Sequence, residues 1–273
     1  MPPTARMAVS HQQDLSSAST PSSSWTAWGQ WLALVAMTAD HLSRYILPEA
    51  AGLGWIESTL GRVAFPLFAA MVAWHGLFNT RNPARYARRV LIIGLAAQIP
   101  FMLMPRETDA FILNVCFTLA GGLFWAAWLK DSAARYHDGS LSAAGAMALA
   151  AASLPAWYLL GQWVEYGHVG LMIIPLAMLA MHQLSQRGDA PGERLLAGLA
   201  AAPVLVIAAQ MNHTDLAKAV TVATCGVTLI LAAGAARYVP RPALIMPRRL
   251  WLAWYPAHFL VIAALLWVLA MLS

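Results

Sequence analysis

Asp40 and His41 are the two residues of this chain whose types and position most strongly indicate chemistry. They are adjacent, and they follow the apolar run Trp-Leu-Ala-Leu-Val-Ala-Met that starts at Trp31. Ionisable side chains inside a membrane-length apolar segment are costly and usually have a partner or a function. A neutral imidazole beside a carboxylate is held in one tautomer and becomes a better general base for an amine or hydroxyl nucleophile. The alternative is a polar cluster that only joins helices.

Arg62 and His258 extend this pair, because each also lies in an apolar stretch. Arg62 is either the counter-charge that keeps Asp40 ionised or a group that stabilises an oxyanion. His258 comes from a segment near the carboxyl terminus, at about mid-membrane depth. We therefore predict a catalytic set of Asp40, His41, Arg62 and His258. Four further polar residues at similar depth are candidates for substrate binding or for hydrogen bonds between helices: Gln98, Asn114, Glu165 and Tyr166.

Composition excludes a soluble protein. The 273 residues are 60% hydrophobic and only 11% charged, whereas soluble domains carry about 25% charged residues. The eight histidines and two cysteines show no spacing typical of metal ligands, so we expect no bound metal. Membrane lipids are the expected surroundings, and no nucleic acid is expected as a partner.

The elements that must position these residues are membrane-spanning helices. Apolar segments of the required length, roughly 17 to 25 residues, fall at 25–47, 55–78, 86–104, 111–129, 141–160, 166–184, 194–210, 216–236 and 250–271. We predict an all-α, polytopic bundle of about nine helices in which residues 25–273 form a single transmembrane domain. Residues 1–24, rich in Ser, Thr, Pro and Gln, are predicted to be a disordered polar tail.

Loop charges predict the orientation of the bundle. When loops are assigned alternately to two sides, nearly all arginines and lysines fall on one side, and only Arg44, Arg106 and Lys218 fall on the other. Because cytoplasmic loops hold the basic residues, the amino terminus should be cytoplasmic and the carboxyl terminus periplasmic. Asp40, His41 and Arg62 then lie in the outer half of the membrane.

The densest basic sequences allow two interpretations. They set topology and contact anionic lipid, or they bind the phosphates of a nucleotide-like cofactor, because guanidinium groups match phosphate geometry. The residues predicted to bind such a cofactor are Arg85, Arg88, Arg89, Arg248 and Arg249.

Several short motifs, taken in order, resemble the TraX family of conjugative-transfer membrane proteins. They are Met37-x-x-Asp40-His41, Gly61-Arg62-x-Ala64-Phe65-Pro66-x-Phe68, Gln98-Ile99-Pro100-Phe101, Asn114-x-x-Phe117-Thr118-Leu119, Glu165-Tyr166-Gly167 and Tyr255-Pro256-x-His258. Ala97 departs from the pattern, which has Ser before Gln-Ile-Pro.

The resemblance implies a multi-pass protein of the bacterial inner membrane that N-acetylates a pilin subunit of a conjugative pilus, with acetyl-coenzyme A as donor. It favours a functional set of Asp40, His41, Arg62, Asn114, Tyr255 and His258, and so adds Tyr255 to the candidate substrate-binding residues.

Two other functions remain open. One is a different reaction at the pilin terminus, either another acylation or head-to-tail closure. The other is a non-catalytic protein that holds pilin before assembly. Acyl transfer predicts a continuous cavity from the arginine loops to Asp40 and His41, whereas a holding protein predicts a dry, packed cluster and a lateral groove.

Overall fold

The protein is a helical bundle, seen here in a computed structural model that describes residues 21–47, 51–106, 110–186, 188 and 190–272. Within these residues there are nine long helices and no strand; one isolated bridge pairs Leu113 with Val164. The elements are α2 (Ser24–Tyr45), α3 (Trp55–Ser58), α4 (Gly61–Trp74), the π-helical η2 (His75–Asn79), α5 (Pro83–Met102), α6 (Val115–His137), α7 (Ala143–Gly161), α8 (Gly167–Gln186), α9 (Pro191–Gln210), α10 (Asp215–Ala232), the 3-10 turn η3 (Ala235–Tyr238) and α11 (Arg248–Leu272).

The predicted all-α fold with about nine helices is confirmed. The tail predicted for residues 1–24 lies mostly outside the described residues, and α2 begins at Ser24, one residue before the predicted start.

Helix starts follow local capping chemistry. The Asn82 side chain accepts a hydrogen bond from the Arg85 amide at the start of α5, and Pro83 occupies the first turn, where its missing N–H costs nothing. Ser142 and Thr214 cap α7 and α10 in the same way. These caps fix where each loop ends and therefore which side chains enter the bundle.

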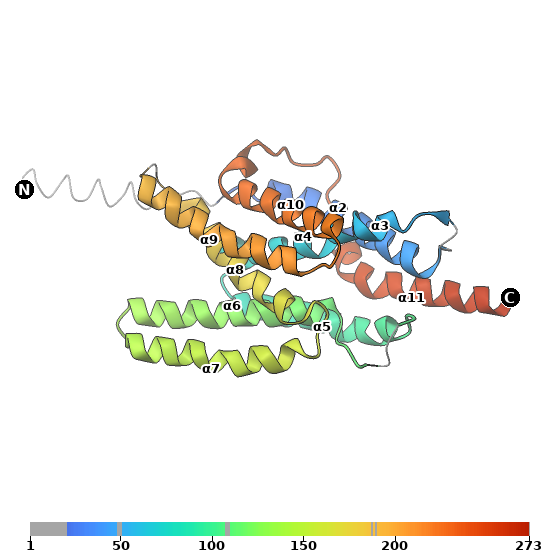
Figure 1. Cartoon of the computed structure of the whole chain (residues 1–273), viewed down its shortest axis with the longest axis horizontal. Helices are drawn as coiled ribbons and strands as arrows, with labels where there is room; N and C mark the ends of the chain where they lie inside the picture. The colour runs from blue at the N-terminus through green and yellow to red at the C-terminus, as the bar shows by residue number, and fades with distance from the viewer. Residues whose placement is uncertain (1–20, 48–50, 107–109, 187, 189, 273) are drawn as a thin grey trace, which may run out of the picture.

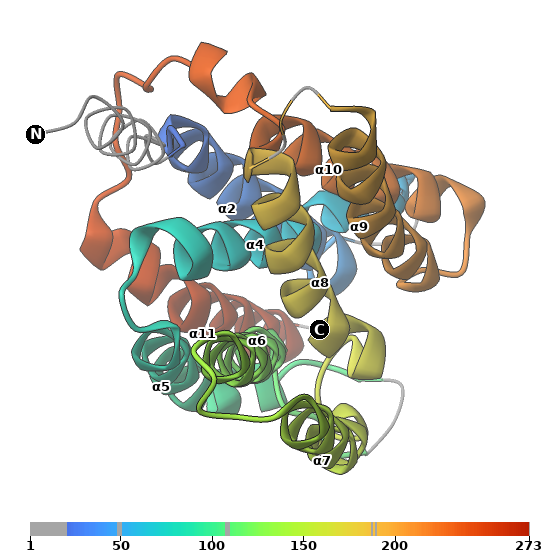
Figure 2. The same cartoon turned by 90° about the vertical axis from the view of Figure 1, so that its left-hand side faces the viewer.

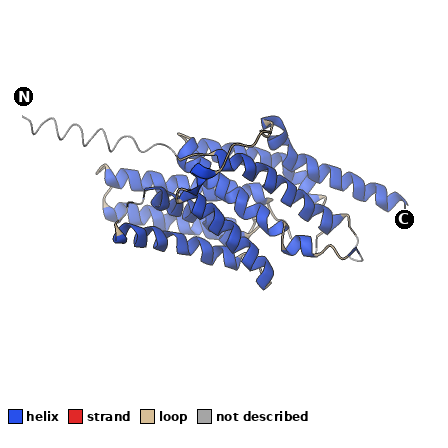
Figure 3. Ribbon diagram, turned by 90° about the horizontal axis from the view of Figure 1, so that it is seen from above, coloured by secondary structure: helices blue, strands red, loops and turns tan. Residues whose placement is uncertain are grey.

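Successive long helices run in opposite directions, roughly along the longest axis of the molecule, which is horizontal in Figure 1. In the end-on view α4 and α8 lie near the centre, while α7 lies at the periphery (Figure 2). This agrees with burial, since many residues of α4 and α8 are buried but only Gly161 of α7 is. Figure 3 shows the same bundle from above, with α11 extending beyond its neighbours toward the carboxyl terminus.

Six segments are long and apolar enough to cross a membrane: Trp55–Asn79, Ala143–Gly161, Gly167–Gln186, Pro191–Gln210, Asp215–Ala232 and Arg248–Leu272. The helices α2, α5 and α6 are 22, 20 and 23 residues long and run alongside these spans, but they carry more polar residues. The fold is therefore that of a multi-pass membrane protein.

The alternating helices divide the loops between two ends of the bundle. The alternation of the helices assigns the loops before α5, after α6 and before α11, with their arginines, to one side of the bundle. The ends of α2 and α5 and the α7–α8 loop lie at the other. Which end faces the cytoplasm stays a prediction.

Candidate functional site

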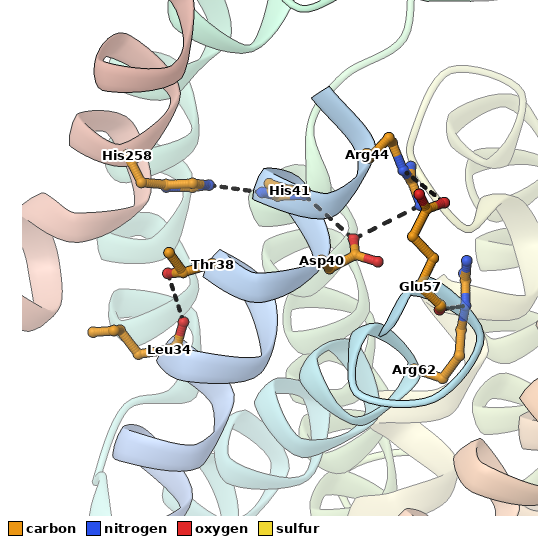
Figure 4. A network of polar contacts seen from close by, with 8 residues as sticks. All are labelled: Leu34, Thr38, Asp40, His41, Arg44, Glu57, Arg62 and His258. Atoms are coloured by element: carbon orange, nitrogen blue, oxygen red, sulfur yellow. Dashed lines mark hydrogen bonds and ion pairs between the residues drawn. The ribbon is translucent and has the colours of Figure 1, made fainter. Parts of the chain in front are cut away.

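Asp40 lies near the carboxyl end of α2 and is only 9% exposed. One carboxylate oxygen, Oδ2, is 3.7 Å from Nη2 of Arg44, which is one helical turn further along α2. The Arg44 Nε is in turn 3.6 Å from the carboxylate of Glu57 on α3 (Figure 4). The buried charge of Asp40 thus has a cationic partner on its own helix, which lowers the cost of burying it.

His41 contacts His258 directly, although 217 positions separate them along the chain. Nδ1 of His41 is 2.8 Å from Nε2 of His258, and Nδ1 of His258 is 2.9 Å from the carbonyl oxygen of Trp254. Nε2 of His41 lies 3.8 Å from Oδ2 of Asp40, which is beyond hydrogen-bond distance. His258, rather than Asp40, therefore orients the His41 ring (Figure 4).

A second hydrogen bond supports this contact between α2 and α11. The Trp254 indole donates to Oγ1 of Thr38, and the Thr38 hydroxyl donates to the Leu34 carbonyl. The Trp254–Thr38 bond lies about one turn from the histidine pair, so it helps to fix the register of the two helices at the site.

Arg62 makes no direct ion pair with Asp40 among the described residues, although it is near enough for its charge to act on the Asp40 carboxylate, and its predicted role stays a prediction. Its Nε donates to the backbone carbonyl of Glu57 at 2.8 Å, and Arg44 instead provides the close counter-charge. The sequence held a signal for Arg44, because residues four apart share a helix face. It held none for Glu57, which reaches the cluster from a separate short helix.

A small cavity of about 50 Å³ adjoins Asp40 and His41, enough for a few atoms the size of water. Glu165, Tyr166 and Tyr255 also line it. Two buried polar atoms among its lining residues have no hydrogen-bond partner: Oδ1 of Asp40 and the hydroxyl of Tyr255. Unpaired buried acceptors are uncommon in folded proteins and call for an explanation such as a bound group.

The loop between α7 and α8 brings Glu165 and Tyr166 to this cavity. Leu113 and Val164 pair across the bridge, and the Thr118 hydroxyl donates to the Glu165 carbonyl. Tyr166 has a left-handed backbone, with φ at 60°, which non-glycine residues adopt at some cost. Burial raises the pKa of the Glu165 carboxyl to about 7, so this loop residue can exchange a proton near neutral pH.

The polar side chains of Gln98 and Asn114 form hydrogen bonds within the protein. Asn114 is fully buried; its amide donates to the Gly94 carbonyl and to Gln98, and its oxygen accepts from the Cys116 amide. Gln98 also donates to the carbonyl of Ile112. Neither residue lines the cavity, so the structure gives them a bracing role, and their predicted contact with substrate stays a prediction.

The five arginines predicted to bind a cofactor are exposed at the starts of α5 and α11, two helices that pack together. No ion pair joins them to a carboxylate within the described ranges. The cavity beside His41 does not extend to these arginines, since none of them lines it; Phe68 in its wall stacks on Trp251 of α11, with ring centroids 5.3 Å apart. The described residues also hold no group of three His, Cys, Asp or Glu side chains that could bind a metal ion.

Comparison with known proteins identifies the family of this chain. Residues 28–266 match the family described as TraX protein, and this range includes the histidine pair, Asp40 and the whole cavity. The chain belongs to the TraX family. The match extends well beyond the motifs near the amino terminus and takes in most of the last helix, including His258.

A curated relative of this TraX protein is the "Uncharacterized protein RP591" of Rickettsia prowazekii (strain Madrid E), 22% identical over 152 residues. The match covers 56% of this chain and 54% of the relative, so the chain spans about half the length of that protein. No solved structure matches the chain.

Proposed function

We propose that this TraX protein is an acetyltransferase of the bacterial inner membrane that transfers an acetyl group from acetyl-coenzyme A to the amino terminus of a conjugative pilin. TraX proteins are linked to the processing of conjugative pilin. The observation that carries the proposal is the cavity beside His41, where the unpaired Asp40 oxygen and the Glu165 carboxylate offer acceptors of the kind that bind a small amine.

The chemistry assigns each cavity residue a role. The pilin amine binds as an ammonium group beside the Asp40 carboxylate and loses one proton to a carboxylate or to solvent. As its nitrogen attacks the thioester carbonyl, His41 takes the second proton, a C–N bond forms and the C–S bond breaks. The leaving thiolate then receives a proton from His41. The Tyr255 hydroxyl can donate to the oxyanion that develops on the carbonyl.

The donor would bind at the opposite, basic end of the bundle. Arg85, Arg88, Arg89, Arg248 and Arg249 are exposed there and offer guanidinium forks to the phosphates of coenzyme A. The acyl-bearing arm would then have to reach the cavity beside His41, whose wall includes Phe68.

One observation favours the holding function as a second candidate. An apolar cavity of about 420 Å³ lies between α6, α7 and α8, lined by Trp125, Trp128 and Trp157 among others. It lies on the peripheral side of the bundle beside α7, as expected of a lateral groove for a pilin helix. The reaction and the groove make separate predictions, so one measurement can decide between them.

The deciding measurement is the intact mass of pilin co-expressed with and without this protein. An added acetyl group supports the proposal. Loss of water indicates head-to-tail closure, and an unchanged mass indicates the holding function; either would overturn it.

Replacing the general base gives the matching variant. His41→Ala should lower the acetylation rate by about 10²- to 10⁴-fold, the usual contribution of a general base. The variant should remain inserted and folded, because the ring lies at the edge of a cavity and is only partly buried. Normal acetylation by a purified His41→Ala protein would remove His41 from the mechanism.

A further inference from the structure

We infer that His258 is a positioning residue whose hydrogen bond selects the tautomer of His41 and thereby leaves Nε2 of His41 as the basic nitrogen. The inference rests on the proposed function, in which His41 is the general base. It concerns which nitrogen acts and what holds it ready.

The first step is the proton on His258. Its Nδ1 lies 2.9 Å from the Trp254 carbonyl oxygen, and a carbonyl oxygen can only accept. Nδ1 of His258 therefore carries a hydrogen. In the neutral ring, Nε2 must then be unprotonated and can only accept.

The second step passes this constraint to His41. Nε2 of His258 and Nδ1 of His41 are 2.8 Å apart, so one proton must lie between them. The two rings are within 4° of parallel, while their centroids are 5.0 Å apart. The nitrogens are much closer than the centroids, so the rings meet end to end in one plane, as a straight hydrogen bond requires (Figure 4). When both rings are neutral, His41 is the donor.

The third step follows for the other nitrogen of His41. With Nδ1 protonated, Nε2 holds the lone pair, and it lies 3.8 Å from Oδ2 of Asp40. His41 lines the cavity together with Asp40. A proton taken up at Nε2 is therefore stabilised by the Asp40 carboxylate, while His258 holds the ring in place.

The same geometry gives His258 no direct chemical role in the acyl transfer. Its ring is 5% exposed, both of its nitrogens are occupied, and it does not line the cavity. It can act on a substrate only through His41.

Two substitutions of His258 separate positioning from catalysis. In His258→Gln the side-chain oxygen lies near the former Nε2 and can still accept from His41. In His258→Leu a side chain of comparable size has no acceptor. We expect His258→Gln to retain kcat to within about 10-fold, and His258→Leu to lose about 10²- to 10⁴-fold, the upper end matching the cost of a wrong tautomer in a histidine-dependent hydrolase. KM for acetyl-coenzyme A should be unchanged in both.

The tautomer of His41 can be measured without an activity assay. Nitrogen-15 NMR of the full-length protein with labelled histidine rings, and with His41 assigned by its loss in His41→Gln, should show protonated Nδ1 and unprotonated Nε2. His258→Leu should move the proton toward Nε2, and His258→Gln should not.

Two results would overturn the inference: equal loss of kcat in His258→Gln and His258→Leu when both are folded, or a native His41 with the proton on Nε2. If native protein leaves the pilin mass unchanged yet shows the inferred tautomer, the proposed function fails and the positioning role of His258 stands.

Discussion

A glycine on the neighbouring helix α4, Gly61, leaves room for the second carboxylate oxygen of Asp40, Oδ1. A Cβ atom placed on Gly61 at the start of α4 would overlap Oδ1 and Cγ of Asp40. Helix α4 can therefore approach α2 this closely only because residue 61 has no side chain, and both Gly61 and Asp40 line the cavity.

Gly61→Ala should therefore displace the Asp40 carboxylate while leaving α4 helical, since Ala favours helix more than Gly. We expect at least about a 10-fold fall in kcat for pilin acetylation, because misplacement by 1 Å can cost about 100-fold. The assay is the rate of acetyl incorporation by purified protein.

Gly226→Ala on α10 is the matched control, because a Cβ there meets no atom within 4 Å. It should leave kcat unchanged. Equal activity of the Gly61→Ala and Gly226→Ala variants would show that the position of the Asp40 oxygen does not matter to the reaction.

At the scale of elements, Asn114 joins α5 to the start of α6. It caps α6 through Cys116 and bonds to both Gly94 and Gln98 of α5. Asn114→Ala should lower the free energy of unfolding by about 2–4 kcal/mol, from a lost cap worth about 1 kcal/mol and unpaired buried groups worth about 1–3 kcal/mol. Thermal unfolding in detergent measures this.

Asn82→Ala is the control for this effect, because Asn82 caps α5 at an exposed position and bonds only to Arg85 in that role. Its loss should cost about 1 kcal/mol or less. The rate of acetyl transfer per folded molecule should be unchanged in both variants. A loss of this rate in Asn114→Ala alone would instead support the predicted contact of Asn114 with substrate.

A second prediction at this scale concerns the contact of α4 with α11. Phe68 lines the cavity and stacks on Trp251, so we expect the pair to limit the access of water to the site. Trp251→Ala should raise hydrolysis of acetyl-coenzyme A in the absence of pilin several-fold. Trp267→Ala, which removes an indole 66% exposed on the same helix, should not. No difference between the two would mean that water is excluded elsewhere.

At the scale of the whole molecule, the arrangement sets two chemically different ends. One end carries exposed arginines, whereas the other holds the cavity lined by Asp40, His41 and Glu165. If the arginines grip coenzyme A through paired hydrogen bonds, Arg88→Lys with Arg249→Lys should raise KM for the donor about 10-fold. Because Lys keeps the positive charge, this effect reports the loss of guanidinium geometry rather than a loss of charge.

Membrane insertion of this double variant should be normal, because the topology rule counts positive charge and ignores its geometry. A reporter fused to the carboxyl terminus measures insertion. Unchanged donor KM with normal insertion would leave these arginines with a topological role alone.

The sequence by itself determined the all-helical fold, the approximate number of long helices among the described residues and the separation of charge between loops. These properties follow from local composition: an apolar run of sufficient length forms a spanning helix wherever it packs. The sequence also singled out Asp40 and His41, because ionisable groups in such a run need a reason to be there.

Only the tertiary structure decided which polar groups meet. It joined His41 to His258, gave Asp40 the partner Arg44, and turned Gln98 and Asn114 toward each other. These contacts depend on how far each helix is rotated and shifted along its neighbour. The spacing of residues within one helix fixes its faces, but it does not specify which face of α11 packs on which face of α2.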